Sequence, residues 1–208
     1  MNRCRRRLLA AAAAAFAAAG LTACDAPSSP AGGKAPAFNG VDITGTGIGS
    51  GLALADLSGR TRTLADFKGR VVVVFFGYTQ CPDVCPTTLA ELAQLRQSLG
   101  ADGARLQVVF VTVDPERDTP ELLRSYMASF DPDFIALRGS PEQTAATAKD
   151  FRIYYAKVAS RRGDAGYTID HTAGSFVFDA QGRARLFVRY GADAAGLRSD
   201  LQALLAAG

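Results

Sequence analysis

One stretch of this sequence sets most of the limits on what the chain can fold into. Residues 71–76 form an uninterrupted apolar run rich in β-branched side chains, and residues 87–99 follow as an amphipathic segment. The first pattern is typical of a central strand covered on both faces, and the second of a helix with one buried side. Between them, residues 77–86 contain Cys81 and Cys85. The pattern predicts two thiols at a strand-to-helix junction.

The rest of the chain alternates between extended and helical patterns that complete one α/β domain. The order of strands and helices predicts a thioredoxin-like fold, with a central mixed sheet flanked by helices. An N-terminal β-hairpin extension and one inserted helix add to the minimal version of this fold. The expected elements are a hairpin at 52–64, strands at 71–76 and 106–113, helices at 87–99, 119–130 and 140–149, a possible strand at 153–158, a hairpin at 175–190 and a closing helix after Asp193.

The N-terminus has the pattern of a bacterial lipoprotein signal peptide. Residues 1–23 carry four arginines among the first seven residues, continue with an apolar segment too short to span a bilayer easily, and end in small residues before Cys24. Residues 21–24 resemble a lipobox, so we expect Cys24 to be lipidated. A plain secretory signal with an incidental cysteine is the alternative. Lipidation predicts an exported protein anchored to the bacterial cytoplasmic membrane and facing the periplasm.

This interpretation fixes the expected domain boundaries and the charge. Residues 24–51 are rich in proline, glycine, serine and alanine, and are interpreted as the lipidated N-terminus and a flexible tether. Residues 52–208 are expected to form the folded domain. Removal of residues 1–23 takes away four arginines, so the net charge changes from +3 to (23 − 4) − 20 = −1. No nucleic-acid partner is therefore expected.

The chemistry of the domain is expected to lie at its two cysteines. An exported compartment permits disulfides, but two free thiols cannot form a framework of structural bridges. A cysteine at a helix N-terminus is stabilised as the thiolate. The spacing of Cys81 and Cys85 predicts two sulfurs on one helical face, able to bind one ion or to close into a disulfide. Structural zinc sites use four protein ligands, whereas soft thiolates select Cu(I).

His171 is the only histidine in the sequence. A lone histidine is ordinarily a surface or core residue, but this one lies between a polar loop and the hairpin at 175–190. In a thioredoxin fold that region faces the active cysteines, so we interpret His171 as a third ligand. An imidazole extends a two-thiolate site to Cu(II). Asp170 could orient the ring, although a solvated loop acid explains it equally well.

Three separated segments carry a resemblance to a known family. Residues 76–86 read FGYTQCPDVCP, residues 113–120 read VDPERDTP, and residues 170–172 read DHT. In this order they resemble the SCO/SenC family of copper-binding cytochrome c oxidase assembly proteins, over about Leu52 to Leu205. Gln80 stands where many members carry a histidine that is not a required ligand.

The resemblance implies a site and a set of partners. The copper ligands of the family correspond to Cys81, Cys85 and His171, which would hold Cu(I) or Cu(II). The implied function is assembly of the copper centre of cytochrome c oxidase by a membrane-tethered metallochaperone. The implied partners are the copper-site subunit of the oxidase and a copper donor protein, with the membrane reached through the lipid anchor.

Two functions remain open at this point, and copper transfer is the one we favour. The alternative is a thiol-disulfide oxidoreductase, in which Cys81 attacks a partner disulfide and Cys85 resolves the mixed disulfide. Its target would be the cysteines of the oxidase copper site or of other exported proteins. Peroxide removal is disfavoured, because the sequence shows no activating arginine close to a single cysteine.

Residues 114–120 also allow two interpretations. Their acids and Arg117 could form a docking surface for a partner. Turn residues and a local ion pair that hold a loop and a helix start explain the same pattern, and we favour this second interpretation.

Overall fold

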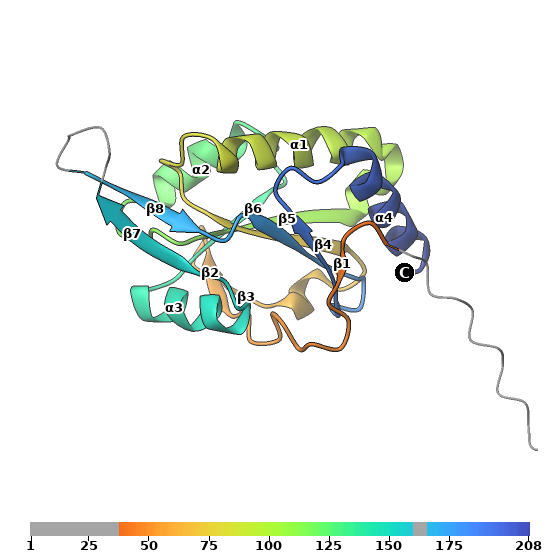
Figure 1. Cartoon of the computed structure of the whole chain (residues 1–208), viewed down its shortest axis with the longest axis horizontal. Helices are drawn as coiled ribbons and strands as arrows, with labels where there is room; N and C mark the ends of the chain where they lie inside the picture. Colours follow the sequence, from red (N-terminus) through yellow and green to blue (C-terminus); the bar gives the residue numbers. More distant parts are fainter. Residues whose placement is uncertain (1–37, 160–165) are drawn as a thin grey trace, which may run out of the picture. The chain divides into compact units, whose positions relative to one another are not determined.

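The computed structural model of the chain describes residues 38–159 and 166–208. Its centre is an eight-stranded mixed sheet in the order β1-β10-β9-β4-β5-β6-β2-β3, and β7 and β8 form a separate two-stranded ribbon (Figure 1). The strands are β1 (Val41–Asp42), β2 (Leu54–Asp56), β3 (Thr61–Arg62), β4 (Val71–Gly77), β5 (Leu106–Thr112), β6 (Ile135–Arg138), β7 (Tyr155–Ala159), β8 (Tyr167–His171), β9 (Gly174–Phe178) and β10 (Ala184–Arg189). The helices are α1 (Val84–Ser98), α2 (Pro120–Ala128), α3 (Pro141–Asp150) and α4 (Ala194–Ala206), with 3-10 turns η1 (Leu64–Phe67) and η2 (Gly100–Arg105).

Strand β4 organises both hydrophobic cores. All of its residues are buried, and it pairs in parallel with β5 and antiparallel with β9. Because side chains alternate along a strand, Val73 and Phe75 enter the core beneath α1, α2 and α4, whereas Val74 and Phe76 enter the core on the other face. The predicted central strand and the predicted thioredoxin-like α/β class are both confirmed.

The predicted starts of α2, α3 and α4 are confirmed by their caps, whereas α1 begins at Val84 and not at the predicted residue 87. The Thr119 hydroxyl accepts from the Leu122 N–H at the start of α2, and the Asp193 carboxylate accepts from two backbone N–H groups of α4. Ser140 and Gln143 form a capping box at α3, with the spacing that the sequence predicts. These starts are predictable because each cap depends on residues within one turn of the helix.

Strands β1, β6 and β8 go beyond the sequence prediction. β1 has 2 residues and β6 has 4, so neither is long enough to show an alternation of apolar and polar side chains. β8 lies between the predicted polar loop, which ends at residue 166, and the predicted hairpin at 175–190, where no strand is predicted. These strands form because a neighbouring strand offers hydrogen-bond partners, which is tertiary information.

The folded part begins before Leu52, so the expected boundary of the flexible tether at residue 51 is wrong. β1 pairs with β10. Ile48 is buried in the core that contains Val74 and Phe76, here called the second core. Asp200 of α4 is buried and accepts hydrogen bonds from the backbone N–H of Asn39 at 3.0 Å and of Gly40 at 2.8 Å. A segment with little periodicity is thus held by contacts with residues far along the chain.

The expected signal peptide (1–23), the lipidation site Cys24 and the tether up to residue 37 lie outside the described residues, so they stay predictions. Within the described ranges, every helix is too short or too polar to serve as a membrane span.

We expect Asp200→Ala to lower the free energy of unfolding by about 2 kcal/mol, because it removes the buried carboxylate that accepts hydrogen bonds from the backbone N–H groups of residues 39 and 40. Urea denaturation measures this loss, and hydrogen exchange should accelerate at residues 39–42. The control is Asp193→Ala, which removes the N-cap of α4 and should lower the free energy of unfolding by about 1 kcal/mol. Asp193 does not bond to the amides of residues 39 and 40. Unchanged exchange at residues 39–42 in Asp200→Ala would contradict the assignment of this segment to the fold.

Candidate metal centre

The two cysteines lie in the loop that joins β4 to α1, here called the dithiol loop (residues 78–85). Cys85 is in the first turn of α1, but Cys81 precedes the helix, where its N–H donates to the Tyr78 carbonyl at 3.2 Å. The prediction of both sulfurs on one helical face is therefore wrong. The Cys85 N–H donates to Cys81 Sγ at 3.4 Å, while the N-cap residue Asp83 forms no side-chain cap. The sulfur of Cys81 thus occupies the capping position of α1.

Cys85 is completely buried against the end of the central strand. Its sulfur lies under Gly77, where an added Cβ atom would come within 2.7 Å of Sγ and 2.9 Å of the Phe110 ring. The backbone of Gly77 is not in the left-handed region, so its conformation alone does not require glycine. Glycine is needed there because a side chain would overlap the Cys85 sulfur and the Phe110 ring. The sequence contains this signal only as a glycine between the apolar run and the first cysteine.

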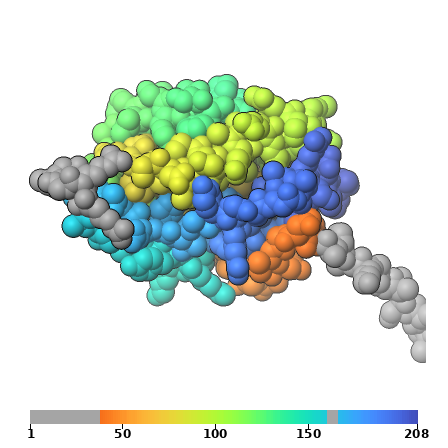
Figure 2. All heavy atoms as spheres, turned by 45° about the horizontal axis from the view of Figure 1, so that its top comes forward, coloured from red at the N-terminus to blue at the C-terminus, as the bar shows by residue number. Residues whose placement is uncertain are grey.

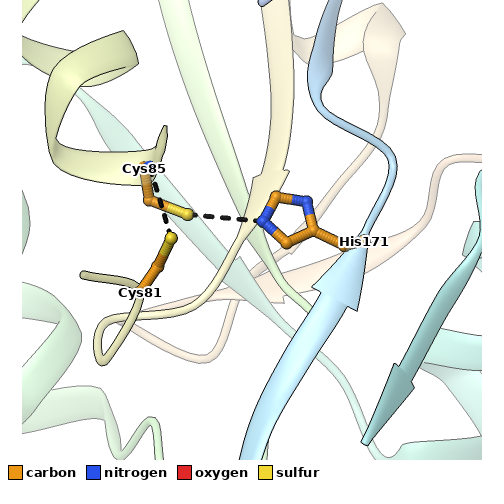
Figure 3. A group of neighbouring side chains, drawn as sticks. All are labelled: Cys81, Cys85 and His171. Carbon is orange, nitrogen blue, oxygen red and sulfur yellow. Dashed lines mark hydrogen bonds between the residues drawn. The ribbon is translucent and has the colours of Figure 1, made fainter. Parts of the chain in front are cut away.

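His171 is the last residue of β8 and approaches the dithiol loop from the ribbon (Figure 3). Its Nε2 lies 3.6 Å from Cys85 Sγ, and its Nδ1 lies 3.1 Å from the carbonyl oxygen of Thr172. A carbonyl oxygen only accepts, so Nδ1–H is the donor and the Nε2 lone pair faces the sulfur in the neutral ring. A backbone carbonyl in this role is a common way to orient a metal-binding histidine.

Sequence reasoning did not identify Thr172 as the residue that orients the ring, and nothing in its identity marks it, because the group that acts is backbone. Asp170, the candidate for that role, is exposed. Successive side chains of a strand point to opposite faces, so its carboxylate lies on the face of β8 away from His171. The interpretation of Asp170 as a solvated acid fits the structure.

The structure brings all three predicted site residues together. The sulfurs of Cys81 and Cys85 and a ring nitrogen of His171 all lie within 4.8 Å of one another. In Figure 2 the dithiol loop (yellow) borders the part of the chain that contains β8 (light blue). Two thiols and one imidazole in this arrangement can hold a soft metal ion, and the two thiols can also exchange with a disulfide.

The two thiols differ in acidity because their surroundings differ. Interaction with the Cys85 thiol is the main cause that lowers the pKa of Cys81 to about 4, and His171 and the N–H groups of Asp83 and Cys85 add to it. Burial of Cys81 opposes this effect. Interaction with Cys81 and complete burial raise the pKa of Cys85 well above its ordinary value. At neutral pH the pair therefore holds one thiolate and one thiol.

The loop between β5 and α2 packs against the dithiol loop and supports this site. Asp114 and Asp118 are buried, and Arg117 forms an ion pair with Asp114. The Asp118 carboxylate accepts from the Thr79 hydroxyl at 2.6 Å and from the Thr112 hydroxyl at 2.5 Å. Buried acids cannot form a docking surface, so that interpretation is wrong for these two acids. The local ion pair of the favoured interpretation is present, and the loop also bonds to residues far away in the sequence.

Comparison with known proteins identifies the family. The family model described as SCO1/SenC matches residues 43–206. The chain belongs to the SCO1/SenC family. The resemblance in the three separated sequence segments is thereby confirmed, and the match includes residues 43–51, which the structure also places in the folded unit.

Relatives of this SCO1/SenC chain come from bacteria and mitochondria. An SCO2-like protein of Rickettsia prowazekii is 37% identical over 136 residues, which cover 65% of this chain and 66% of the relative. The structure of Bradyrhizobium japonicum ScoI with copper bound has a TM-score of 0.65 at 35% identity, covering 81% of this chain and 99% of the other. Apo Sco1 of Thermus thermophilus has a TM-score of 0.69 at 39% identity, covering 83% and 99%. The alignment thus spans slightly less than two thirds of the rickettsial protein.

We expect the alkylation rate of Cys81 by iodoacetamide to be nearly constant from pH 5.5 to 8, because the pKa of about 4 leaves it as thiolate throughout. In Cys85→Ala the main stabilising partner is lost, so the pKa should rise and the rate should increase with pH across this range. Peptide mass spectrometry measures the rate at Cys81 itself. Cys85→Ser keeps a donor and is the control that should retain the flat profile. A flat profile in Cys85→Ala would contradict the assigned cause.

We expect Gly77→Ala to lower the free energy of unfolding by about 1–3 kcal/mol, because the methyl group overlaps Cys85 Sγ and the Phe110 ring. Displacement of Cys85 should also raise the pKa of Cys81, visible in the same alkylation profile. Gly51→Ala is the control, since a Cβ atom there meets only ordinary contacts with Asp150 at 3.4 Å. Equal stability of the two variants in urea would show that the site tolerates a side chain at position 77.

Proposed function

We propose that this protein binds copper through Cys81, Cys85 and His171 and delivers it to the copper centre of cytochrome c oxidase. The observation that carries the proposal is the cluster of two sulfurs and one imidazole nitrogen within 4.8 Å, with the nitrogen lone pair directed at the sulfurs. Membership of the SCO1/SenC family and the copper bound to the Bradyrhizobium japonicum relative support the same conclusion.

The ligand set suits copper in either oxidation state. Two soft sulfur ligands favour Cu(I), and the imidazole adds the nitrogen ligand that Cu(II) accepts. Structural zinc sites take four protein ligands, and among the described residues this cluster offers three. A site with three protein ligands leaves the ion accessible to a ligand of the next protein, which is what a carrier needs.

The protonation states indicate what loading requires of this chain. Cys81 supplies a thiolate that already exists at neutral pH, and His171 directs Nε2 at the sulfur because its Nδ1–H donates to the Thr172 carbonyl. Cys85 must lose its proton to bind as a thiolate, so loading releases one proton from the buried thiol. Delivery would reverse these steps. The ligands of the receiving site would replace those of this chain one at a time, and Cys85 would take up a proton again.

A second candidate function rests on the unequal thiols. Cys81 is half-buried and ionised, whereas Cys85 is buried and protonated, the arrangement of an attacking and a resolving cysteine. The Cys81 thiolate would attack a partner disulfide and release one partner thiol. Cys85 would then lose its proton, displace the second partner thiol and close the Cys81–Cys85 disulfide, so the partner gains the two electrons that this chain loses.

The proposed setting of either activity is the periplasmic face of the bacterial cytoplasmic membrane. The signal peptide and Cys24 supply the argument, because a lipidated N-terminus would hold the domain near a membrane-embedded oxidase. A copper donor protein would load the site, and the copper-site subunit of the oxidase would receive the ion.

We expect His171→Ala to lower Cu(II) affinity by at least about 100-fold, since a direct ligand contributes more than the 10–100-fold of its supporting contacts. The thiolate-to-Cu(II) charge-transfer absorption of the reduced, loaded protein should also disappear. Titration with buffered Cu(II), followed by absorption, measures both effects.

The control is the rate at which the same variant reduces a small disulfide, which should remain close to that of the wild type because both cysteines are intact. Equal Cu(II) affinity with and without His171 would contradict the three-ligand site. Loss of disulfide reduction alone would favour the oxidoreductase.

A further inference from the structure

The strand that carries His171 is not part of the main sheet. β7 and β8 pair only with each other, so the hydrogen bonds of the main sheet do not fix the distance between His171 and the dithiol loop. In Figure 1 this ribbon extends to one side of the sheet, and β8 runs back toward it. The placement of the imidazole therefore depends on its contacts with the Phe75 and Tyr78 rings, on the short link to β9, and on what holds the ribbon.

The loop between β5 and α2, here called the spacer loop (residues 114–118), holds the start of β8. Arg117 Nη1 donates to the Tyr167 carbonyl oxygen at 2.8 Å, and its guanidinium lies 3.6 Å from the centre of the Tyr167 ring. The Tyr167 hydroxyl donates to Asp114 Oδ1 at 2.9 Å. A further ion pair joins Glu116 to Lys157 of β7 at 2.7 Å, which is more exposed and contributes less.

The same loop holds the segment that carries the cysteines. Arg117 Nη1 also donates to Gln80 Oε1 at 3.1 Å, directly before Cys81 in the chain. Asp118 accepts from the Thr79 hydroxyl at 2.6 Å and, over longer distances, from the Thr79 N–H. Guanidinium forks fix geometry in a way that a single ammonium group cannot.

The spacer loop itself is firmly attached to the sheet. Arg138 of β6 donates to the backbone carbonyls of Asp118 at 3.0 Å and of Pro115 at 2.8 Å. The Thr112 hydroxyl at the end of β5 donates to the Asp118 carboxylate. The loop can therefore act as a fixed reference between the ribbon and the dithiol loop.

The geometry of β8 connects Tyr167 with His171. Tyr167, Ile169 and His171 alternate with Thr168 and the exposed Asp170, so the three share the inward face of the strand. Tyr167 meets the spacer loop, Ile169 is buried in the second core, and His171 meets the sulfurs. Two ends of one short strand, about 13 Å apart, are thus fixed on the same side.

We propose that Arg117 is a positioning residue for His171, which it holds at binding distance from the two thiols by clamping Tyr167 against the dithiol loop. A metal ligand contributes fully only when it is held within about 0.5 Å of its productive position. Loss of the clamp lets the ribbon move relative to the thiols, and the imidazole is then the ligand that is lost. This role rests on the proposed copper site but has a consequence that needs no metal.

The test compares Arg117→Lys with Arg96→Lys. Lysine keeps the positive charge but loses the planar stack and the fork. Arg96 is a matched control, because its side chain is 18% exposed against 20% for Arg117, and it binds Asp131 and Asp133 far from the site. We expect Arg117→Lys to lower Cu(II) affinity about tenfold, as is typical for a contact that supports a metal ligand, and Arg96→Lys to leave it unchanged.

A double-mutant cycle separates positioning from general destabilisation. If Arg117 acts through His171, Arg117→Lys should cause no further loss of Cu(II) affinity in the His171→Ala background. Tyr167→Phe removes only the bond to Asp114 and keeps the ring under Arg117, so it should cause a smaller loss. A tenfold loss that persists without His171 would overturn the proposal.

Hydrogen exchange of the metal-free protein gives a readout that survives failure of the copper function. We expect faster exchange of the β8 amides in Arg117→Lys than in Arg96→Lys, with unchanged exchange in β4 and β5. Equal β8 exchange in the two variants would overturn the positioning role whatever the affinity for copper. If His171→Ala leaves Cu(II) affinity unchanged while β8 exchange accelerates in Arg117→Lys, the copper site fails and the clamp on the ribbon stands.

Discussion

The burial of the Cys85 thiol at the end of β4 is the constraint on which the site depends. Gly77 leaves just enough room for that sulfur, and the strand cannot move because both of its faces are covered. Cys85 therefore stays protonated, and its thiol and its N–H group both act on Cys81. Burial of this one group thus makes Cys81 a thiolate and keeps Cys85 a protonated thiol. Both proposed chemistries need this difference in protonation.

The imidazole reaches the thiols from a part of the chain with separate support. His171 ends a ribbon outside the main sheet, and its ring is oriented by the adjacent carbonyl of Thr172. The rigid α/β core therefore fixes two ligand atoms, whereas the strand that bears the third is held by the burial of Ile169 and by polar and cation–π contacts with the spacer loop. In the proposed role as a copper carrier, such a division would help release of the ion, because ligands held by different elements can leave in separate steps.

Sequence patterns predicted the elements whose causes are local. The β4 run, the caps at Thr119, Ser140 and Asp193, and the placement of the thiols at a strand-to-helix junction all follow from residues within a few positions. The position of Cys81 outside the helix could not be predicted from its spacing. An i, i+4 spacing suggests a shared helical face, but Pro86 has no N–H and Cys81 Sγ caps the first turn instead. The sequence cannot show where such a helix begins.

The sequence by itself determined which residues of the folded domain are available for chemistry: two cysteines at a strand-to-helix junction that activates a thiol, and one histidine. The three-dimensional fold decided how they are used. It brought His171 to within 3.6 Å of Cys85, set the two thiols apart in acidity and joined residues 38–51 to the domain. These outcomes depend on burial and on contacts between distant segments, and neither quantity is contained in local spacing or propensity.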